Sequence, residues 1–232
     1  MKISEIFHSI QGEGKLVGMP SLFIRTSGCN LRCIWCDTPY SSWRPTGDNL
    51  TVAEILAQVE TQNCHHVVIT GGEPMMQPEM PALITALRKI NRHITVETAG
   101  TLWQDVPMDL ASISPKMSNS TPLDDPAWSQ VHDQRRLNWE VLSKFAQAEV
   151  IRERQWKFVI CQPEDLREVD TILSHISTVA PIHPSDVILM PEGVTTDAVQ
   201  LRSQWLAPIC RQRGFRFGMR LHILLYGNTR GT

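Results

Sequence analysis

The sequence predicts an α/β fold in which helices pack against a parallel sheet. Segments typical of strands alternate with segments typical of helices along most of the chain. The 232 residues suffice for a sizeable core, and a composition of 42% apolar and 20% charged residues is ordinary for a globular protein. A barrel and an open doubly wound sheet both fit this alternation. Residues 1–232 are expected to form a single domain.

The first three elements are clear in the residue pattern. Residues 21–27 (SLFIRTS) are an apolar run between a proline and a glycine, which predicts a strand. Residues 51–60 (TVAEILAQVE) place their apolar side chains on one helical face, and Thr51 with Glu54 fits a capping box. Residues 66–70 (HVVIT) are a short, continuous apolar run that stops at two glycines, which is typical of a buried strand.

The middle of the chain continues the alternation and then becomes polar. Residues 78–90 predict a helix with Pro81 in its first turn and apolar side chains on one face. Residues 93–100 (HITVETAG) and 110–114 (LASIS) predict two more strands. Residues 117–136 are a long polar segment that fits neither pattern.

The rest of the chain returns to alternating helices and strands. We expect a helix over 137–147, a strand over 155–161, a helix over 163–176, a strand with its turn over 186–193, a helix over 195–210 and a last strand over 215–225.

Four short motifs directly follow predicted strands. CNLRCIWC follows the first strand, GGEP follows HVVIT, SPK follows LASI, and MPEG follows DVIL. In α/β folds with parallel strands, functional residues gather at the carboxyl ends of the strands. We therefore expect the functional site where these four motifs meet.

Three of the six cysteines lie within eight residues, at Cys29, Cys33 and Cys36. A structural zinc site needs four nitrogen or sulfur ligands, and no second pair of cysteines or well-placed histidines completes such a set. The triad instead fits a four-iron cluster with one iron left open for a cofactor or substrate. The other cysteines stand alone and are expected to be small buried side chains, at Cys64, Cys161 and Cys210.

Charge and hydropathy argue against several classes of protein. The net charge of −2 gives no strong basic field for nucleic acid or anionic membranes. No apolar run approaches the roughly 18 residues of a membrane span, and the first residues lack the pattern of a signal peptide. We expect a cytoplasmic protein, in which clustered thiols indicate metal or redox chemistry rather than disulfides.

The C-x3-C-x2-C spacing, with an aromatic residue before the last cysteine, resembles the motif of the radical S-adenosylmethionine (SAM) enzymes. GGEP at Gly71–Pro74 is similar to the second motif of that superfamily, whose backbone groups face the methionine amine of SAM. GGEP alone would favour a plain turn. Together the motifs imply a [4Fe-4S] cluster held by three cysteines, with SAM chelating the open iron.

A longer resemblance points to one family. The stretch SIQGEGKLVGMPSLFIRTSGCNLRCIWCDT resembles the 7-carboxy-7-deazaguanine synthases, which act in queuosine and deazapurine biosynthesis. The similarity continues through VVITGGEP, ITVETAGT, SISPK and LHILLYGN, but does not extend to the polar segment 117–136. It implies an incomplete, modified (β/α) barrel of the radical SAM type, with the cluster loop at its mouth. It also implies a Mg²⁺ ion, a one-electron donor such as a flavodoxin, and a homodimer.

The resemblance also implies a set of site residues, none of which is assigned as a catalytic acid or base. Cys29, Cys33 and Cys36 would hold the cluster, and Thr38 would bind Mg²⁺. Arg25 would hold a substrate carboxylate, and its residue pattern alone allows a solvated strand residue equally well. The other expected substrate contacts are Ile10, Gln11, Gly12, Thr70 and His222, with Glu97 as an inward acid or a partner of Arg25. The expected SAM contacts are Trp35, Cys36, Asp37, Gly72, Glu73, Ser114, Pro115, Lys116, Met190, Pro191, Glu192 and Gly193.

The implied reaction is a ring contraction. It converts 6-carboxy-5,6,7,8-tetrahydropterin to 7-carboxy-7-deazaguanine with loss of ammonia, and the resemblance implies that SAM is regenerated. A glycyl-radical activating enzyme would use the same cluster on a partner protein, but SIQGEG and Thr38 argue against that alternative. A zinc module or a simple electron-transfer module would need four protein ligands, which the triad does not provide.

Overall fold

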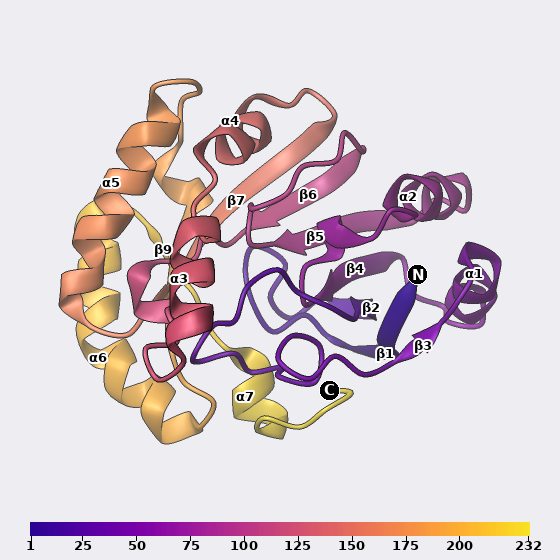
Figure 1. The fold of residues 1–232 in the computed structure, drawn as a ribbon, viewed down its shortest axis with the longest axis horizontal. Helices are drawn as coiled ribbons and strands as arrows, with labels where there is room; N and C mark the ends of the chain where they lie inside the picture. The colour runs from indigo at the N-terminus through magenta and orange to yellow at the C-terminus, as the bar shows by residue number, and fades with distance from the viewer.

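The strands of the chain form one open sheet in a computed structural model that describes residues 1–232. The strand order is β3-β1-β2-β4-β5-β6-β7-β8-β9, and Figure 1 shows the strands fanning across the molecule. Neighbours from β2 to β9 are parallel, whereas β1 is antiparallel to both β2 and β3. The strands are β1 Lys2–Ile10, β2 Pro20–Thr26, β3 Asp48–Asn49, β4 His66–Gly71, β5 His93–Thr98, β6 Met108–Ile113, β7 Ile151–Ile160, β8 Val187–Pro191 and β9 Arg216–Phe217.

Helices connect the parallel strands and cover one side of the sheet. In Figure 1, helices α1 and α2 lie towards the end of the sheet that begins with β3, and helices α5 and α6 lie towards the end that finishes with β9. The prediction of parallel strands packed against helices is confirmed, and the sheet is open, not closed into a barrel. The helices are α1 Val52–Glu60, α2 Met80–Lys89, α3 Pro126–Arg135, α4 Trp139–Gln147, α5 Leu166–Ser177, α6 Thr196–Arg213 and α7 Leu221–Tyr226, with 3-10 turns at Pro74–Met76, Ser118–Ser120, Pro163–Asp165 and Pro184–Asp186.

The core forms between the central strands and these helices. The capping box of Thr51 and Glu54 is present at the start of α1, whose Ile55 and Val59 are fully buried. Strand β4 is buried on both faces, as Val67, Val68 and Ile69 show. One cluster of 36 buried residues includes side chains from strands β1, β2 and β4 to β8 and from helices α1, α2, α4, α5 and α6. The predicted apolar face of α2 is confirmed as Met80, Leu83, Ile84 and Leu87, all buried.

Two segments differ from the sequence expectations. The long strand β1 was not predicted, because most of its side chains are half-buried on an antiparallel strand near the sheet edge and form no continuous apolar run. The strand expected over 215–225 is wrong, since only Arg216–Phe217 pair with β8 and the chain then turns into helix α7. The backbone N–H of Leu221 donates to the carbonyl of Gly12 at 2.9 Å, which ties the start of this helix to another loop.

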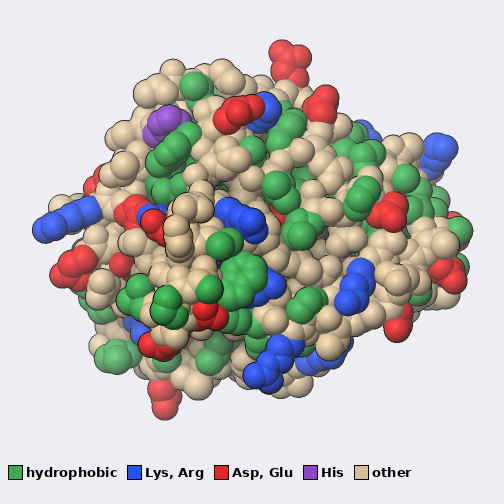
Figure 2. All heavy atoms as spheres, viewed as in Figure 1, with side chains coloured by type: hydrophobic (Ala, Val, Ile, Leu, Met, Phe, Trp, Pro, Cys, Tyr) green, Lys and Arg blue, Asp and Glu red, His purple; other side chains and the backbone are tan.

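The polar segment 117–136 is ordered, with a 3-10 turn followed by helix α3. Cys64 and Cys210 are buried, as expected, whereas Cys161 is only half-buried at the end of β7. None of the helices is both long and apolar enough to pass through a membrane. Figure 2 shows acidic and basic side chains interspersed over the face in view, in keeping with the small net charge.

Candidate active site

A cavity of about 420 Å³ opens at the carboxyl ends of the parallel strands. Its wall includes the cysteine loop after β2, the turn after β4, the SPK residues after β6 and the end of β8. The four motifs singled out in the sequence therefore meet at one site, because the carboxyl ends of parallel strands share one edge of a sheet.

The three cysteines of the loop all line this cavity as free thiols. The backbone N–H of Leu31 donates to Sγ of Cys29 at 3.4 Å, and the Ser42 hydroxyl lies 3.1 Å from Sγ of Cys36. Burial raises the pKa of Cys29 and Cys33 to about 12, so thiolates there require a nearby cation. The triad does not form the tight group that a single metal ion needs, which fits a larger cluster better than zinc.

The GGEP turn packs directly against the backbone of the cysteine loop. The N–H of Glu73 donates to the carbonyl of Gly28 at 2.9 Å, and a Cβ at Gly72 would overlap that same carbonyl oxygen. Gly71 has φ +137°, and a Cβ there would overlap the carbonyl oxygen of Thr26. Both glycines are therefore required for the two motifs to approach this closely.

The carboxylate of Glu73 faces the protein interior instead of the cavity. It is fully buried and accepts hydrogen bonds from Thr98 Oγ1 at 2.8 Å, from the N–H of Ala99 at 2.8 Å and from the N–H of Met75 at 3.1 Å. With three donors already bound, this side chain holds the GGEP turn on the end of β5. The structure does not place it among the cavity-lining groups expected to contact SAM.

The remaining expected SAM contacts divide into two groups. Lys116 lines the cavity, donates to the hydroxyl of Ser114 at 2.8 Å and lies 5.7 Å from the ring centre of Trp35. Glu192 instead pairs with Arg202 at 3.0 Å. The expected SAM contacts in the cavity wall are Trp35, Cys36, Asp37, Gly72, Ser114, Lys116 and Met190, whereas Glu73, Pro115, Pro191, Glu192 and Gly193 lie outside it.

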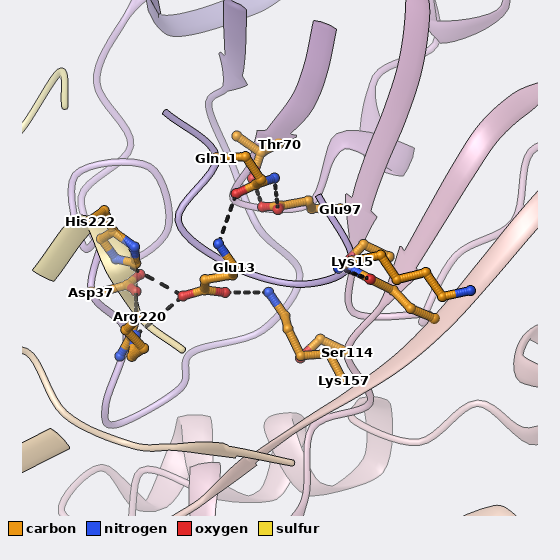
Figure 3. A network of polar contacts seen from close by, with 12 residues as sticks. Gln11, Glu13, Lys15, Asp37, Thr70, Glu97, Ser114, Lys157, Arg220 and His222 are labelled. Atoms are coloured by element: carbon orange, nitrogen blue, oxygen red, sulfur yellow. Dashed lines mark hydrogen bonds and ion pairs between the residues drawn. The ribbon is translucent and has the colours of Figure 1, made fainter. Parts of the chain in front are cut away.

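The expected substrate contacts form another part of the wall. The Gln11 amide donates to Glu97 at 3.2 Å and the Thr70 hydroxyl donates to Glu97 at 2.9 Å, as Figure 3 shows. Glu97 was expected as a possible partner of Arg25, but these are its partners, and Arg25 pairs with Glu5. The expected substrate contacts in the wall are Ile10, Gln11, Gly12, Arg25, Thr70 and His222.

Helix α7 carries His222 against the QGEG loop. A Cβ at Gly12 would overlap the imidazole ring of His222, so this glycine permits the close approach. The expectation that His222 lies on a strand is wrong, because the residue belongs to helix α7. Its side chain nevertheless lines the cavity, as expected. Burial lowers the pKa of His222 despite the nearby carboxylate of Glu13, which favours the neutral ring at pH 7.

A buried ionic network that the sequence analysis missed joins these loops. Glu13 pairs with Lys157 of β7 and with Arg220, and Arg220 also pairs with Asp37 in the cysteine loop. Figure 3 shows these side chains converging from separate elements. Burial alone would raise the pKa of Glu13, but Lys157 and Arg220 hold it well below its usual range. A lysine in the otherwise apolar run WKFVI was the sequence signal that could have revealed this network.

Two carboxylates of this network lie close to the imidazole of His222, in a grouping that could hold a metal ion. Ligand atoms of Glu13, Asp37 and His222 all lie within 4.8 Å of one another. The two carboxylates are already neutralised by Lys157 and Arg220.

The hydroxyl of Thr38, the expected Mg²⁺ ligand, lines the same cavity, 3.8 Å from Sγ of Cys36.

The polar segment 117–136 supports the cysteine loop from outside the cavity. The N–H of Ile34 donates to the carbonyl of Ser120 at 2.9 Å, and the indole of Trp35 donates to the carbonyl of Asn119 at 3.0 Å. The guanidinium of Arg32 stacks over Trp128 of α3 at 4.2 Å. The segment therefore helps to fix the loop that carries the cysteines.

Comparison with known proteins agrees with this geometry. Residues 23–119 match the model of the radical SAM superfamily. The 7-carboxy-7-deazaguanine synthase of Halobacterium salinarum is 41% identical over 98% of this chain and 91% of its own length. The enzyme of the same name from Rhodopirellula baltica is also 41% identical, over 99% of this chain and 88% of its own.

Solved structures show the same fold. The crystal structure of QueE from Escherichia coli superposes with a TM-score of 0.67 at 24% identity, over 95% of this chain and 94% of that chain. A structure of TYW1 with a lysine-pyruvate adduct gives a TM-score of 0.53 at 14% identity, over 81% and 73% of the two chains. At these low identities the structural matches show only the fold, whereas the sequence matches at 41% identity show the family. The chain belongs to the 7-carboxy-7-deazaguanine synthase family of the radical SAM superfamily.

Proposed function

We propose that this chain converts 6-carboxy-5,6,7,8-tetrahydropterin to 7-carboxy-7-deazaguanine, and that the cavity described above is where it does so. One observation supports the site assignment above all. A single cavity wall brings together the cysteine triad, the GGEP turn and an arginine suited to a carboxylate, in a member of this family.

The cofactors of this family are a [4Fe-4S] cluster, SAM and Mg²⁺. Cys29, Cys33 and Cys36 would hold the cluster through their sulfurs, and the Thr38 hydroxyl would give Mg²⁺ one oxygen ligand. When bound, cluster and SAM supply a one-electron cleavage that yields a carbon radical able to abstract hydrogen from the substrate. The protein supplies position and shelter from water.

The residues around SAM provide contacts of different kinds. Gly72 lines the cavity and offers its backbone carbonyl, since its N–H already donates to the carbonyl of Thr26 at 3.2 Å. Lys116 and Ser114 form a hydrogen-bonded pair in the wall that suits the hydroxyl groups of a ribose. Trp35 presents an aromatic ring nearby, suited to stacking or to excluding water.

The pterin would bind against the opposite part of the wall. Its ring edge presents donors and acceptors side by side, and the Gln11 amide and Glu97 carboxylate offer the complementary groups. Thr70 and Gln11 hold Glu97 in place before substrate arrives. Arg25 would bind the substrate carboxylate through two parallel hydrogen bonds.

The ionic network would keep the loops of the site together during turnover. Glu13, Lys157 and Arg220 connect the QGEG loop, β7 and the start of α7. The Asp37–Arg220 pair extends this connection to the cysteine loop. Since the cavity has to close around reactive chemistry, this network is suited to limiting the entry of water.

Further properties belong to the same proposal. We propose a cytoplasmic enzyme of one domain that works as a homodimer and receives electrons from a donor such as a flavodoxin. Sedimentation would test the dimer, and reduction of the reconstituted cluster by purified flavodoxin would test the donor. A chain that sediments as a monomer would reject the homodimer. A cluster that only a chemical reductant reduces would reject flavodoxin as the electron donor.

Anaerobic reconstitution tests the function itself. The purified chain would be loaded with iron and sulfide, mixed with SAM, Mg²⁺, reductant and 6-carboxy-5,6,7,8-tetrahydropterin, and analysed by mass spectrometry. We expect 7-carboxy-7-deazaguanine in large excess over cleaved SAM. Cluster-loaded protein that consumes SAM but forms no deazaguanine would reject the assignment. Product equal in amount to 5′-deoxyadenosine would reject the regeneration of SAM.

A glycyl-radical activating enzyme is the less favoured alternative. Such an enzyme needs an exposed groove for a peptide, whereas this cavity is lined by side chains suited to a small polar heterocycle, such as Gln11, Glu97 and Arg25. The sequence relatives named above carry the name of the deazaguanine enzyme.

A further inference from the structure

The guanidinium of Arg25 is held on one side only. Its Nε donates to Oε1 of Glu5 at 2.7 Å, and both side chains are largely buried. Neither terminal nitrogen of Arg25 makes a hydrogen bond within the protein, and the side chain lines the cavity. The edge of the guanidinium that binds carboxylates with two parallel bonds is therefore free.

Glu5 has further partners that come from distant parts of the chain. The Tyr40 hydroxyl donates to Oε1 at 2.8 Å, and Nε of Arg230 donates to Oε2 at 3.1 Å. Burial raises the pKa of Tyr40 to about 12, so the phenol remains a neutral donor. Both oxygens of Glu5 are thus occupied, and the carboxylate is fixed relative to β1 and β2.

Arg230 is itself held at the cavity edge. Its guanidinium lies 4.4 Å from the ring centre of Tyr40, and it donates to the carbonyl of Ser4 at 2.8 Å. The Phe7 ring centre lies 5.5 Å from the guanidinium carbon of Arg25, and Phe7 stacks on Phe23. Aromatic rings beside the charges exclude water and strengthen their interaction with an anion.

The charges of the group do not cancel. Arg25 and Glu5 together are neutral, and Arg230 adds one positive charge beside them. A neutral ion pair attracts an anionic ligand weakly, whereas the group of three retains one net positive charge for it. Arg230 is about half exposed, at 48%, so its share of this attraction depends on salt.

We propose that Glu5 is a positioning residue for Arg25, that Arg230 supplies the net positive charge of the group, and that the group selects carboxylated pterins over pterins without the carboxylate. Glu5 fixes the direction of the free guanidinium edge, and Arg230 provides the net charge that attracts the carboxylate. This inference rests on the proposed function, since it assumes that Arg25 faces the pterin.

The two residues should affect different quantities. In Arg230→Gln the group loses its net charge, so the affinity for a carboxylated pterin should fall about tenfold, with little change in kcat. Arg230→Lys should retain most of the affinity because it keeps the charge. In Glu5→Gln the net charge rises, so affinity should not fall, but Arg25 is held less firmly. Misplacement of the substrate by about 1 Å can cost on the order of a hundredfold in rate, so kcat should fall.

The experiment uses the cluster-loaded full chain in the presence of SAM. Binding of 6-carboxypterin and of unsubstituted pterin is titrated by fluorescence at two salt concentrations, and kcat and KM are measured with the tetrahydropterin substrate. Arg213→Gln serves as the control, because Arg213 pairs with Asp170 outside the cavity wall. We expect Arg230→Gln to lower the preference for 6-carboxypterin most strongly at low salt, while the control does not change it.

The outcomes separate this inference from the proposed function. A wild-type chain that forms product and prefers 6-carboxypterin, with Arg230→Gln and Glu5→Gln variants that behave identically to it, overturns the roles of Glu5 and Arg230 alone. Equal weakening of both pterins by Arg230→Gln also overturns them, because it indicates a general structural defect. A wild-type chain that neither forms product nor distinguishes the two pterins rejects the function on which the inference rests.

Discussion

Nδ1 of His132 accepts a hydrogen bond from the backbone N–H of Arg32 at 3.1 Å. His132 lies in helix α3 and is fully buried, while Arg32 lies between two of the cysteines. Since Nδ1 is the acceptor, Nε2 carries the proton and donates to the hydroxyl of Ser120 at 2.9 Å. The neutral ring therefore connects the polar segment to the loop that carries the cysteine triad.

This connection predicts a pH dependence of stability. Burial and the nearby Arg136 lower the pKa of His132 from 6.5 to about 4 in the folded protein. Below pH 6.5 the unfolded chain binds a proton at this ring that the folded chain does not, so stability falls as pH decreases towards 4. At pH 7 this contribution is fully present.

Urea unfolding of the wild type and of His132→Gln between pH 7 and pH 4 would measure the effect. The wild type should lose on the order of 2 kcal/mol more than the variant across this window, because glutamine does not titrate. The other histidines with lowered pKa values, His66, His93 and His222, are present in both proteins and cancel in the comparison. Parallel curves for the two proteins would contradict the role of His132.

The cysteine triad gives a prediction about metal content. Changing Cys29, Cys33 or Cys36 to alanine should remove most of the iron and sulfide that the reconstituted protein retains, because each change deletes a ligand. Cys64→Ala and Cys210→Ala are matched controls, since both thiols are buried outside the cavity. Iron and sulfide analysis with the absorption spectrum would decide, and normal loading of Cys33→Ala would remove it from the ligand set.

The sequence predicted the site best where motifs follow strands. The cysteine loop and the GGEP turn were located correctly, because each directly follows a parallel strand, and these strands appear in the sequence as continuous apolar runs. The contact of Glu73 with SAM stays a prediction for its backbone, since its carboxylate turns inward to Thr98 and Ala99. The direction of a side chain at a turn depends on the neighbouring strand, which the local sequence does not specify.

Ion pairs between residues far apart in the chain could not be predicted from the local sequence pattern. Glu13 and Arg220 are 207 residues apart, and only the fold brings them together. Helix α7 was expected as a strand because LHILL is a short apolar run, and such runs do not distinguish helix from strand. The role of the segment 117–136 was also invisible, since its contacts to the cysteine loop are made largely by backbone carbonyls and one buried histidine.

The buried network predicts a large effect of removing its central cation. Arg220→Met should lower the free energy of unfolding by about 3–5 kcal/mol, because it leaves the carboxylate of Asp37 without a partner and leaves the buried Glu13 with Lys157 alone. Arg213→Met removes an exposed pair with Asp170 and should cost less than about 1 kcal/mol. Urea unfolding at pH 7.5 measures both, and similar small losses in the two variants would show that the network adds little to stability.

Thr38 gives a prediction about the magnesium ion. Its hydroxyl lines the cavity beside Cys36, and the proposed function gives it the role of an oxygen ligand to Mg²⁺. Thr38→Ala should retain iron, sulfide and SAM binding, because none of them requires this oxygen. Turnover should fall, and the Mg²⁺ concentration that gives half-maximal rate should rise about tenfold if one ligand worth about 1.4 kcal/mol is lost.

Thr38→Ser is the matched control, since it keeps the oxygen and loses only a methyl group. Its Mg²⁺ dependence should stay close to that of the wild type. If Thr38 merely stabilised the turn, the alanine variant would unfold at lower urea concentration and show the same Mg²⁺ dependence as the wild type. Initial rates over a range of Mg²⁺ concentrations, measured together with urea unfolding for the three proteins, separate these two roles, and an unchanged half-maximal concentration in Thr38→Ala would exclude Thr38 from the metal site.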